Sequence, residues 1–190
     1  MKVLGIVGSA RKGGNTEILV MEALASAQDA GAQTELVSVV GKTIAPCDGC
    51  GSCRQTGACH IHDDMESIYQ QLEAADAIVF GSPVYFGSVS AQTKAIMDRT
   101  YLLLGDRKLK GKAAAPVLAV RRVGAGQTRN LLYGYFMSHG MVPVRGAIGY
   151  GRERGDVRQG VGGAQGLSAL EEARTVGTDL VQMVRQLSKP

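Results

Sequence analysis

The sequence predicts an α/β fold: a doubly wound, five-stranded parallel sheet of order 2-1-3-4-5 between two layers of helices. Short apolar runs alternate with longer stretches of helical spacing, as in successive βαβ units with right-handed crossovers. Runs such as 77–80 are apolar without alternation, which is typical of strands buried on both faces. At 190 residues, 45% hydrophobic and 20% charged, the chain is expected to form one domain over 1–190.

The first half of the pattern begins with an apolar run at Val3–Val7, which predicts the first strand. Residues 16–27 have helical spacing, with Asn15 or Thr16 placed to cap the helix start. The second strand is expected at 35–40. The rest of the helices and strands follow a cysteine-rich loop at 45–62.

Beyond that loop, Asp63 with Glu66 three residues later predicts a capped helix that ends near Ala74. The last helix, from 167, carries one apolar stripe, and the glycine-rich stretch 149–166 before it is expected to be a mobile loop or arm. The elements between them are a strand at 77–80, a turn at Gly81-Ser82-Pro83, a helix around 91–104, a strand at 117–120, a helix at 127–139 and a strand at 142–148.

The charge and hydropathy of the chain limit its function classes. No apolar run approaches the ~20 residues that cross a bilayer, and the N-terminal run is too short for a signal peptide, so a cytoplasmic protein is expected. A net charge of +4 without a nucleic-acid-binding motif disfavours nucleic acid. Basic residues recur in the second half, either as a solvated surface or as a docking face for an anionic partner: Lys108, Lys110, Lys112, Arg121, Arg122, Arg152, Arg154 and Arg158.

The segment 8–16 lies between the first strand and the first helix, where a helix N-terminus offers N–H groups to an anion. Gly8 and Gly13 have the spacing of the ATP-binding loop, but the lysine and hydroxyl that this loop requires are missing. A phosphate that is bound and not transferred, as in FMN, is therefore favoured over an ordinary tight turn. The candidate residues are Ser9, Arg11, Gly13, Asn15 and Thr16.

The segment 81–88 follows the third strand and combines aromatic and glycine residues. A flat heteroaromatic ring needs an apolar wall and main-chain donors, and this segment offers both; a packed turn is the alternative. The glycines of 121–127 after the fourth strand permit close approach to a ligand, although a plain turn is equally consistent. The candidate residues are Pro83, Val84, Tyr85, Phe86, Gly87, Ser88, Gly124, Gly126 and Gln127.

All four cysteines lie in one stretch with the spacing C-x2-C-x2-C-x5-C: Cys47, Cys50, Cys53 and Cys59. Three thiols at intervals of three in a glycine-rich loop, closed by a fourth, favour a [4Fe–4S] cluster. Zinc and free or redox-switching thiols are the alternatives, and disulfides are disfavoured in a chain that builds its own core. His60 and His62 are expected to be surface residues rather than ligands.

The motifs GSARKGGNT, ADAIVFGSPVYFGSVSAQTKAIMDR and RRVGAGQ together resemble the NAD(P)H-dependent FMN reductase superfamily of flavodoxin-like proteins over about residues 1–150. With CDGCGSCRQTGAC, the chain is similar to the iron–sulfur flavoprotein branch. The resemblance implies homodimers or homotetramers with the flavin near a subunit boundary. It also implies FMN with its phosphate at Ser9, Arg11, Asn15 and Thr16, its ring against Pro83, Val84, Tyr85, Phe86, Gly87 and Ser88, and Gly124, Gly126 and Gln127 closing the site.

Two such redox centres predict a flavin-dependent oxidoreductase that passes electrons between a low-potential or NAD(P)H donor and an acceptor such as a quinone, oxygen or peroxide. A ferredoxin-like carrier is a candidate partner, and no side chain is expected to act as an essential acid or base, because flavin N5 carries the chemistry. One alternative is a conventional NAD(P)H-dependent FMN or quinone reductase with structural or zinc-binding cysteines. Another is a non-catalytic redox sensor.

Overall fold

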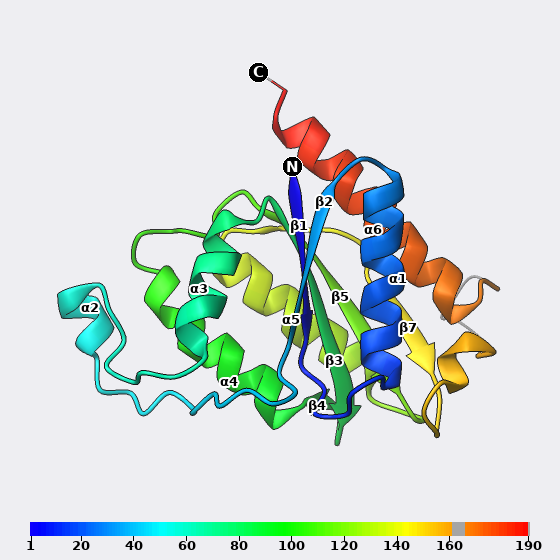
Figure 1. The fold of residues 1–190 in the computed structure, drawn as a ribbon, viewed down its shortest axis with the longest axis horizontal. Helices are drawn as coiled ribbons and strands as arrows, with labels where there is room; N and C mark the ends of the chain where they lie inside the picture. The colour runs from blue at the N-terminus through cyan, green and yellow to red at the C-terminus, as the bar shows by residue number, and fades with distance from the viewer. Residues whose placement is uncertain (161–165, 190) are drawn as a thin grey trace.

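A computed structural model describes residues 1–160 and 166–189 of the chain and confirms the predicted sheet. Its parallel strands have the order β2-β1-β3-β5-β6, which is the expected 2-1-3-4-5 core of the fold (Figure 1). A short strand, β4, pairs antiparallel with the end of β3. The strands are β1 (Lys2–Val7), β2 (Gln33–Ser38), β3 (Ala77–Tyr85), β4 (Ser88–Val89), β5 (Ala113–Val120), β6 (Val142–Pro143) and β7 (Ala147–Tyr150).

Helices cover both faces of the sheet (Figure 1). The long helices α1 (Asn15–Asp29) and α6 (Ala169–Leu187) lie on one face. The helices α3 (Met65–Ala74), α4 (Ala91–Arg99) and α5 (Ala125–Ser138) lie on the other, and the short α2 (Ser52–Thr56) stands apart in the cysteine loop. Among the described residues, no helix has the length and apolar character needed to cross a membrane.

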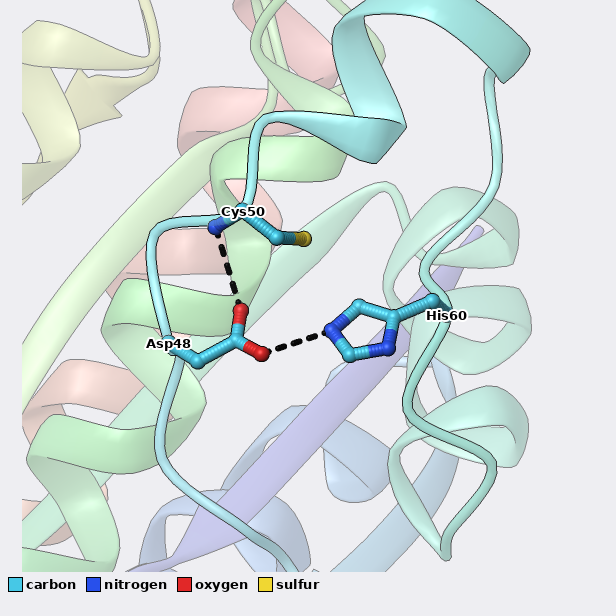
Figure 2. A group of neighbouring side chains, drawn as sticks. All are labelled: Asp48, Cys50 and His60. Atoms are coloured by element: carbon cyan, nitrogen blue, oxygen red, sulfur yellow. Dashed lines mark hydrogen bonds and ion pairs between the residues drawn. The ribbon is translucent and has the colours of Figure 1, made fainter.

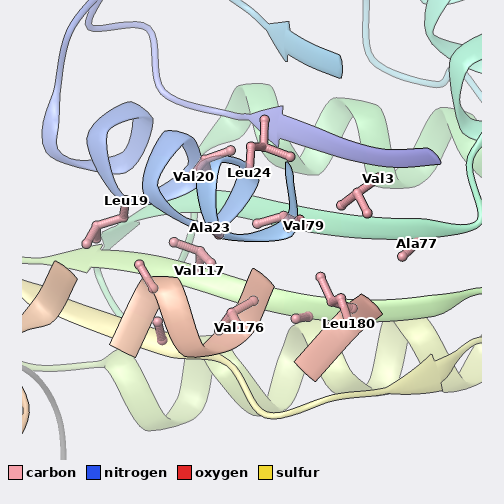
Figure 3. Packing of buried hydrophobic residues seen from close by; sticks show 14 of the residues in the cluster. Val3, Leu19, Val20, Ala23, Leu24, Ala77, Val79, Val117, Val176 and Leu180 are labelled. Carbon is pink, nitrogen blue, oxygen red and sulfur yellow. The ribbon is translucent and has the colours of Figure 1, made fainter. Parts of the chain in front are cut away.

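The buried side chains form two cores, one on each face of the sheet. Figure 3 shows the first core, where α1 and α6 pack together over β1, β3 and β5. The two helices approach closely at Gly177, where an added Cβ would lie 2.0 Å from the carbonyl oxygen of Ala23. Each fully buried aliphatic side chain in such a core contributes about 1.5–3 kcal/mol to folding. This packing fixes the N-terminus of α1 at the edge of the sheet where the strands end.

The last predicted strand, 142–148, is interrupted rather than continuous. It forms β6 and β7, and both pair with β5. Pro116 of β5 stands opposite the break, and proline has no N–H to donate to a neighbouring strand. Gly146 passes so close to it that a Cβ would lie 2.4 Å from the Pro116 carbonyl oxygen. The missing donor and the close approach explain the break.

The predicted turn at Gly81-Ser82-Pro83 is wrong, because β3 continues through these residues in register with β5. The chain reverses instead at Phe86 and Gly87, where φ is 51° and 75°. The sequence does not show that β3 outlasts its apolar run. The extra residues carry the predicted ring-binding segment beyond the sheet edge.

The predicted cap of α1 is also wrong. Gly14 occupies the cap position, and no side chain caps the helix, since the Asn15 amide bonds to residues 153–155 instead. At α3, the predicted N-cap Asp63 is also wrong, because Asp64 occupies that position without a side-chain cap bond. The Asp63 carboxylate accepts the N–H of Met65, and Glu66 pairs with His62, so the capping box does not form.

At the C-terminal side, the described part of the stretch 149–166 includes regular structure that the sequence did not predict. Gly149 and Tyr150 belong to β7, and residues Asp156–Arg158 form a 3-10 turn, while 161–165 lie outside the described residues. A capping box starts α6, where the Ser168 hydroxyl accepts the N–H of Glu171 and the Glu171 carboxylate accepts the N–H of Ser168. The helix expected around 91–104 ends at Arg99 and continues as a 3-10 turn over Thr100–Leu103.

Candidate functional site

A cavity of about 790 Å³, here called the strand-end pocket, opens at the carboxyl ends of β1, β3 and β5. Three loops that are distant in sequence meet there, as parallel topology requires. Gly13, Ser88 and Gly126, which the sequence placed in the site, do not line it. Eleven predicted residues do: Ser9, Arg11, Asn15, Thr16, Pro83, Val84, Tyr85, Phe86, Gly87, Gly124 and Gln127.

One end of the strand-end pocket is the N-terminus of α1. Because no side chain caps this helix, its first-turn N–H groups have no side-chain acceptor, and they carry the positive end of the helix dipole. The hydroxyl-bearing residues Ser9 and Thr16 are buried at the same place, 3% and 2% exposed. Ser9 Oγ accepts the N–H of Arg11 at 3.2 Å and so shapes the turn. This end has the groups that bind a phosphate.

A buried hydroxyl network fixes the first and third strand ends relative to each other. Ser90 Oγ donates to the carbonyl oxygen of Gly8 at 2.5 Å, and its N–H donates to Ser82 Oγ at 3.1 Å. Thr93 Oγ1 donates to Ser82 Oγ at 3.0 Å, and a Cβ on Gly8 would lie 1.8 Å from Thr93 Oγ1. Sequence reasoning missed this network, although Ser90 directly before a predicted helix was a usable signal. The network holds the segment 8–16 against the segment 81–88.

The opposite wall combines apolar side chains with close main-chain packing. Tyr85 and Phe86 are exposed at the mouth of the pocket, and Phe86 is held in the left-handed region at φ 51°, which is rare for a bulky residue. Gly124, at φ 95°, packs on Gly87 so closely that a Cβ would lie 2.7 Å from Gly87 Cα. The two loops therefore form one wall with open main chain, which suits a flat ring.

The rim of the strand-end pocket is strongly basic. The 151–154 segment was missed as part of the site, and Asn15 holds it there: its Nδ2 donates to the Glu153 carbonyl oxygen at 2.9 Å, and its Oδ1 accepts the N–H of Gly155 at 2.7 Å. Among the residues that the structure describes, Glu153 is the one acidic residue that lines the pocket. The basic residues around it are Arg11, Arg121, Arg122, Arg152 and Arg154, all exposed.

A second cavity of about 440 Å³, the cysteine cavity, is lined by all four cysteines. Their thiols are free; Cys47 and Cys50 are exposed, whereas Cys53 and Cys59 are half-buried. Three glycines at φ 71–74° turn the chain around this cavity, two of them flanking α2: Gly49, Gly51 and Gly57. The remaining walls are Asp48, Arg54, Ile61, Asp98, Arg99, Tyr101 and Leu102.

His60 lies closer to the cysteines than the sequence predicted, although it is exposed as expected. Figure 2 shows the Asp48 carboxylate between Cys50 and His60: it accepts the Cys50 N–H at 3.1 Å and pairs with His60 Nε2 at 2.7 Å. The Cys50 N–H, followed by the His60 contact, holds the pKa of Asp48 below its ordinary value. His62 pairs with Glu66 instead and does not line the cavity.

The strand-end pocket and the cysteine cavity share no lining residue. Helix α4 begins shortly after β4 (Figure 1), and its last residue, Arg99, lies in the wall of the cysteine cavity. A helix of nine residues spans about 13 Å.

Known proteins match this chain along its whole length. The model of the NADPH-dependent FMN reductase family matches residues 1–153. An iron-sulfur flavoprotein of Methanocaldococcus jannaschii is 38% identical over 199 residues, covering 100% of both chains. An iron-sulfur flavoprotein of Methanosarcina thermophila is 41% identical over 147 residues, covering 76% of this chain and 77% of that one.

Solved structures share the fold at low identity. A flavodoxin, WrbA-like protein from Agrobacterium tumefaciens has a TM-score of 0.68 at 19% identity, covering 98% of both chains. An archaeal flavodoxin has a TM-score of 0.63 at 15% identity, covering 97% of this chain and 99% of that one. These likenesses show the flavodoxin-like fold. The family match and the full-length relative establish that the chain belongs to the NADPH-dependent FMN reductase family, together with relatives named iron–sulfur flavoproteins.

Proposed function

We propose that the strand-end pocket binds FMN and that the cysteine cavity binds a [4Fe–4S] cluster, so that the chain passes electrons between them. The observation that carries this proposal is the placement of all four thiols on one cavity, at the far end of a helix that begins shortly after β4. When bound, FMN exchanges one or two electrons and a [4Fe–4S] cluster exchanges one, so the pair converts between two-electron and one-electron partners.

The residues of the strand-end pocket fit FMN. The uncapped N-terminus of α1, with Ser9, Asn15, Thr16 and the Arg11 cation, suits the phosphate. Pro83, Val84, Tyr85, Phe86 and Gly87 suit the ring, and Gly124 leaves the main chain open beside it. Apart from Tyr85, Glu153 and the arginines, no ionisable side chain in the described part of the chain lines this pocket, so the chain's part is to bind and orient the flavin.

The residues of the cysteine cavity fit a cluster. Cys47, Cys50, Cys53 and Cys59 are free thiols on one wall, and thiolates are the ligands that iron–sulfur clusters take. The N–H groups of the glycine-rich chain around α2 suit the sulfides of such a core. Four thiolates also suit zinc, so assays of iron and zinc in the purified chain are needed to identify the metal.

The basic rim supports an anionic electron donor, either the phosphates of NAD(P)H or an acidic ferredoxin-like carrier. Arg121, Arg122, Arg152 and Arg154 surround the opening with Glu153 as the opposing charge. A cleft lined by one sign of charge raises the encounter rate with a partner of opposite charge. A quinone, oxygen or peroxide is the proposed acceptor.

We infer that the chain works as a homodimer or homotetramer. Phe86 and Val123 project apolar side chains into solvent beside the strand-end pocket, a position that favours contact with another copy.

A conventional NADPH-dependent FMN reductase without a cluster is the second candidate, and the family match favours it. Anaerobic stopped-flow reduction by NADPH, NADH and a reduced ferredoxin, in the wild-type chain and in Cys59→Ala, separates the two. If electrons pass through the cluster, Cys59→Ala keeps its flavin and loses transfer to a one-electron acceptor. Unchanged transfer in Cys59→Ala would favour the conventional reductase. Ser52→Ala, in the same loop, is the control.

A further inference from the structure

A single buried guanidinium holds both ends of the cysteine loop. Arg99, the last residue of α4, is 2% exposed and lies in the wall of the cysteine cavity. Its Nη1 donates to the carbonyl oxygen of Ala45 at 3.0 Å, and its Nη2 donates to that of Ile61 at 3.1 Å. Ala45 precedes the first cysteine and Ile61 follows the last. The two bonds therefore join the points where the loop leaves and re-enters the domain.

Asp63 and Tyr69 fix Arg99 in this position. The Asp63 carboxylate accepts from Nη1 at 2.8 Å and from Nη2 at 3.1 Å, and it also accepts the N–H groups of Ala45 at 2.9 Å and Met65 at 3.0 Å. Arg99 Nε donates to the Tyr69 hydroxyl at 3.2 Å, and that hydroxyl donates to the Arg99 carbonyl oxygen. Every N–H of the guanidinium thus has an acceptor, and the acceptors belong to the loop ends and to α3.

Only arginine can make this set of contacts. Its planar fork pairs with a carboxylate through two parallel bonds while its other N–H groups remain free for carbonyl oxygens. Lysine keeps the charge but has no fork, so it cannot reach Ala45, Ile61 and Asp63 together. The Arg99 contacts lie at the loop ends and not at the cysteines, so removing them leaves the thiols chemically intact.

Four thiolates in this cavity would add to the negative charge of Asp48 and Asp98, and the cations in its lining are Arg54 and Arg99. The charge of Arg99 is already paired with the buried Asp63 carboxylate, so what Arg99 gives the site is a fixed geometry. Buried ion pairs of this kind hold a geometry more than they add stability.

We propose that Arg99 is the positioning residue of the cysteine site: by tying Ala45 to Ile61 through Asp63, it holds the cysteine loop in the form that takes up the metal centre. This inference rests on the proposed function, because it assigns Arg99 to the assembly of the same cluster. Arg99 touches no electron-carrying group, so its effect passes through the loop.

Two variants test the proposal in the full-length chain with FMN bound. Arg99→Lys keeps the charge and loses the fork. The double variant Asp63→Asn/Arg99→Met removes both buried charges, so that no unpaired ion is left to unfold the domain. Thr100→Val is the matched control: Thr100 is the next residue, is fully buried, and bonds to Met97, Tyr135 and His139 but not to the loop.

The first readout needs no cluster. Since every cysteine lies in this loop, the anaerobic reaction of the metal-free chain with a maleimide reports on the loop alone, and amide hydrogen exchange of residues 46–60 reports on its backbone. At Cys53 and Cys59, which are half-buried in the wild-type chain, both variants are expected to react about tenfold faster than the wild-type chain and Thr100→Val, and their loop amides are expected to exchange faster. After reconstitution with iron and sulfide, both should lose most of their iron, and any residual cluster should have an altered EPR spectrum.

The outcomes separate the positioning role from the proposed function. Variants that retain FMN and show wild-type exchange and iron content would overturn the role of Arg99. Loss of FMN in both variants would also overturn it, because Arg99 would then hold the whole domain rather than the loop. Arg99-dependent protection in a chain that never takes up iron would refute the cluster while leaving Arg99 as the residue that holds the loop.

Discussion

Gly124 packs directly on Gly87: a Cβ at position 124 would lie 2.7 Å from Gly87 Cα. The two residues belong to loops that follow different strands, β5 and β3, and their contact forms the wall proposed for the flavin ring. Gly124 also has φ 95°, a conformation that side chains rarely adopt. Both the contact and the backbone conformation therefore require glycine.

Gly124→Ala is expected to weaken FMN binding at least tenfold, because the added methyl must push the two loops apart. Titration of the FMN-free chain, followed by quenching of flavin fluorescence, measures the loss. Gly126→Ala is the control, since Gly126 does not line the pocket and its Cβ would meet no atom within 4 Å. Equal affinities for the two variants would show that this wall does not bind the ring.

Replacing arginines at the rim of the strand-end pocket by neutral residues should slow reduction of the bound flavin by an anionic electron donor. Arg122→Gln/Arg154→Gln is expected to lower kcat/KM for NADPH or a ferredoxin by about tenfold at low salt, with the difference shrinking as salt screens the charges. Arg158→Gln removes the same kind of charge from a residue outside the pocket lining and should change little. A salt-independent loss would point to a direct bond rather than to attraction by the rim.

Gly177→Ala tests the packing that positions α1. In a helix, glycine to alanine usually stabilises by about 1 kcal/mol, but here the methyl would lie 2.0 Å from the Ala23 carbonyl oxygen. We expect a loss of about 2–4 kcal/mol in the free energy of unfolding, measured with urea. Gly134→Ala in α5, where a Cβ meets no atom within 4 Å, should stabilise the chain instead.

The buried His139 gives the fold an acid sensitivity. Burial lowers the pKa of His139 from its ordinary 6.5, so the folded chain keeps the ring neutral, bonded to Thr100, while the unfolded chain takes up a proton. The stabilisation that comes from keeping His139 neutral in the folded chain is complete above pH 6.5. It decreases as the pH falls below 6.5 toward the lower pKa of the folded chain.

Between about pH 7 and pH 5, the unfolding free energy of the wild-type chain should fall, because the unfolded chain takes up a proton at His139 that the folded chain resists. His139→Gln, followed by urea unfolding across this range, should flatten this dependence. An identical slope in wild type and His139→Gln would contradict the assignment.

The sequence was sufficient to predict the sheet order and most of the strand-end pocket, because periodicity and parallel topology bring strand ends together. Periodicity does not show where β3 ends after its apolar run stops. The sequence therefore predicts a turn at 81–83, whereas the chain turns at Phe86–Gly87. The break opposite Pro116 likewise depends on which residues face each other across strands.

The contacts made by polar side chains were the least predictable part. The sequence predicts that the Asn15 side chain caps the first helix. Instead, its amide bonds to a segment about 140 residues away along the chain. No role for Arg99 follows from the sequence, and only the fold shows that it bonds to both ends of the cysteine loop. Long-range hydrogen bonds of this kind leave no periodic signal in a single sequence.

The central claim is that one chain holds both a flavin and an iron–sulfur cluster. Purification under strict exclusion of oxygen, followed by iron, labile sulfide, zinc and FMN assays with EPR of the reduced protein, tests it most directly. We predict one FMN with about four iron atoms and four sulfides per chain, and an EPR signal of a reduced [4Fe–4S] cluster. A chain with zinc, or with neither iron nor sulfide, would contradict the claim.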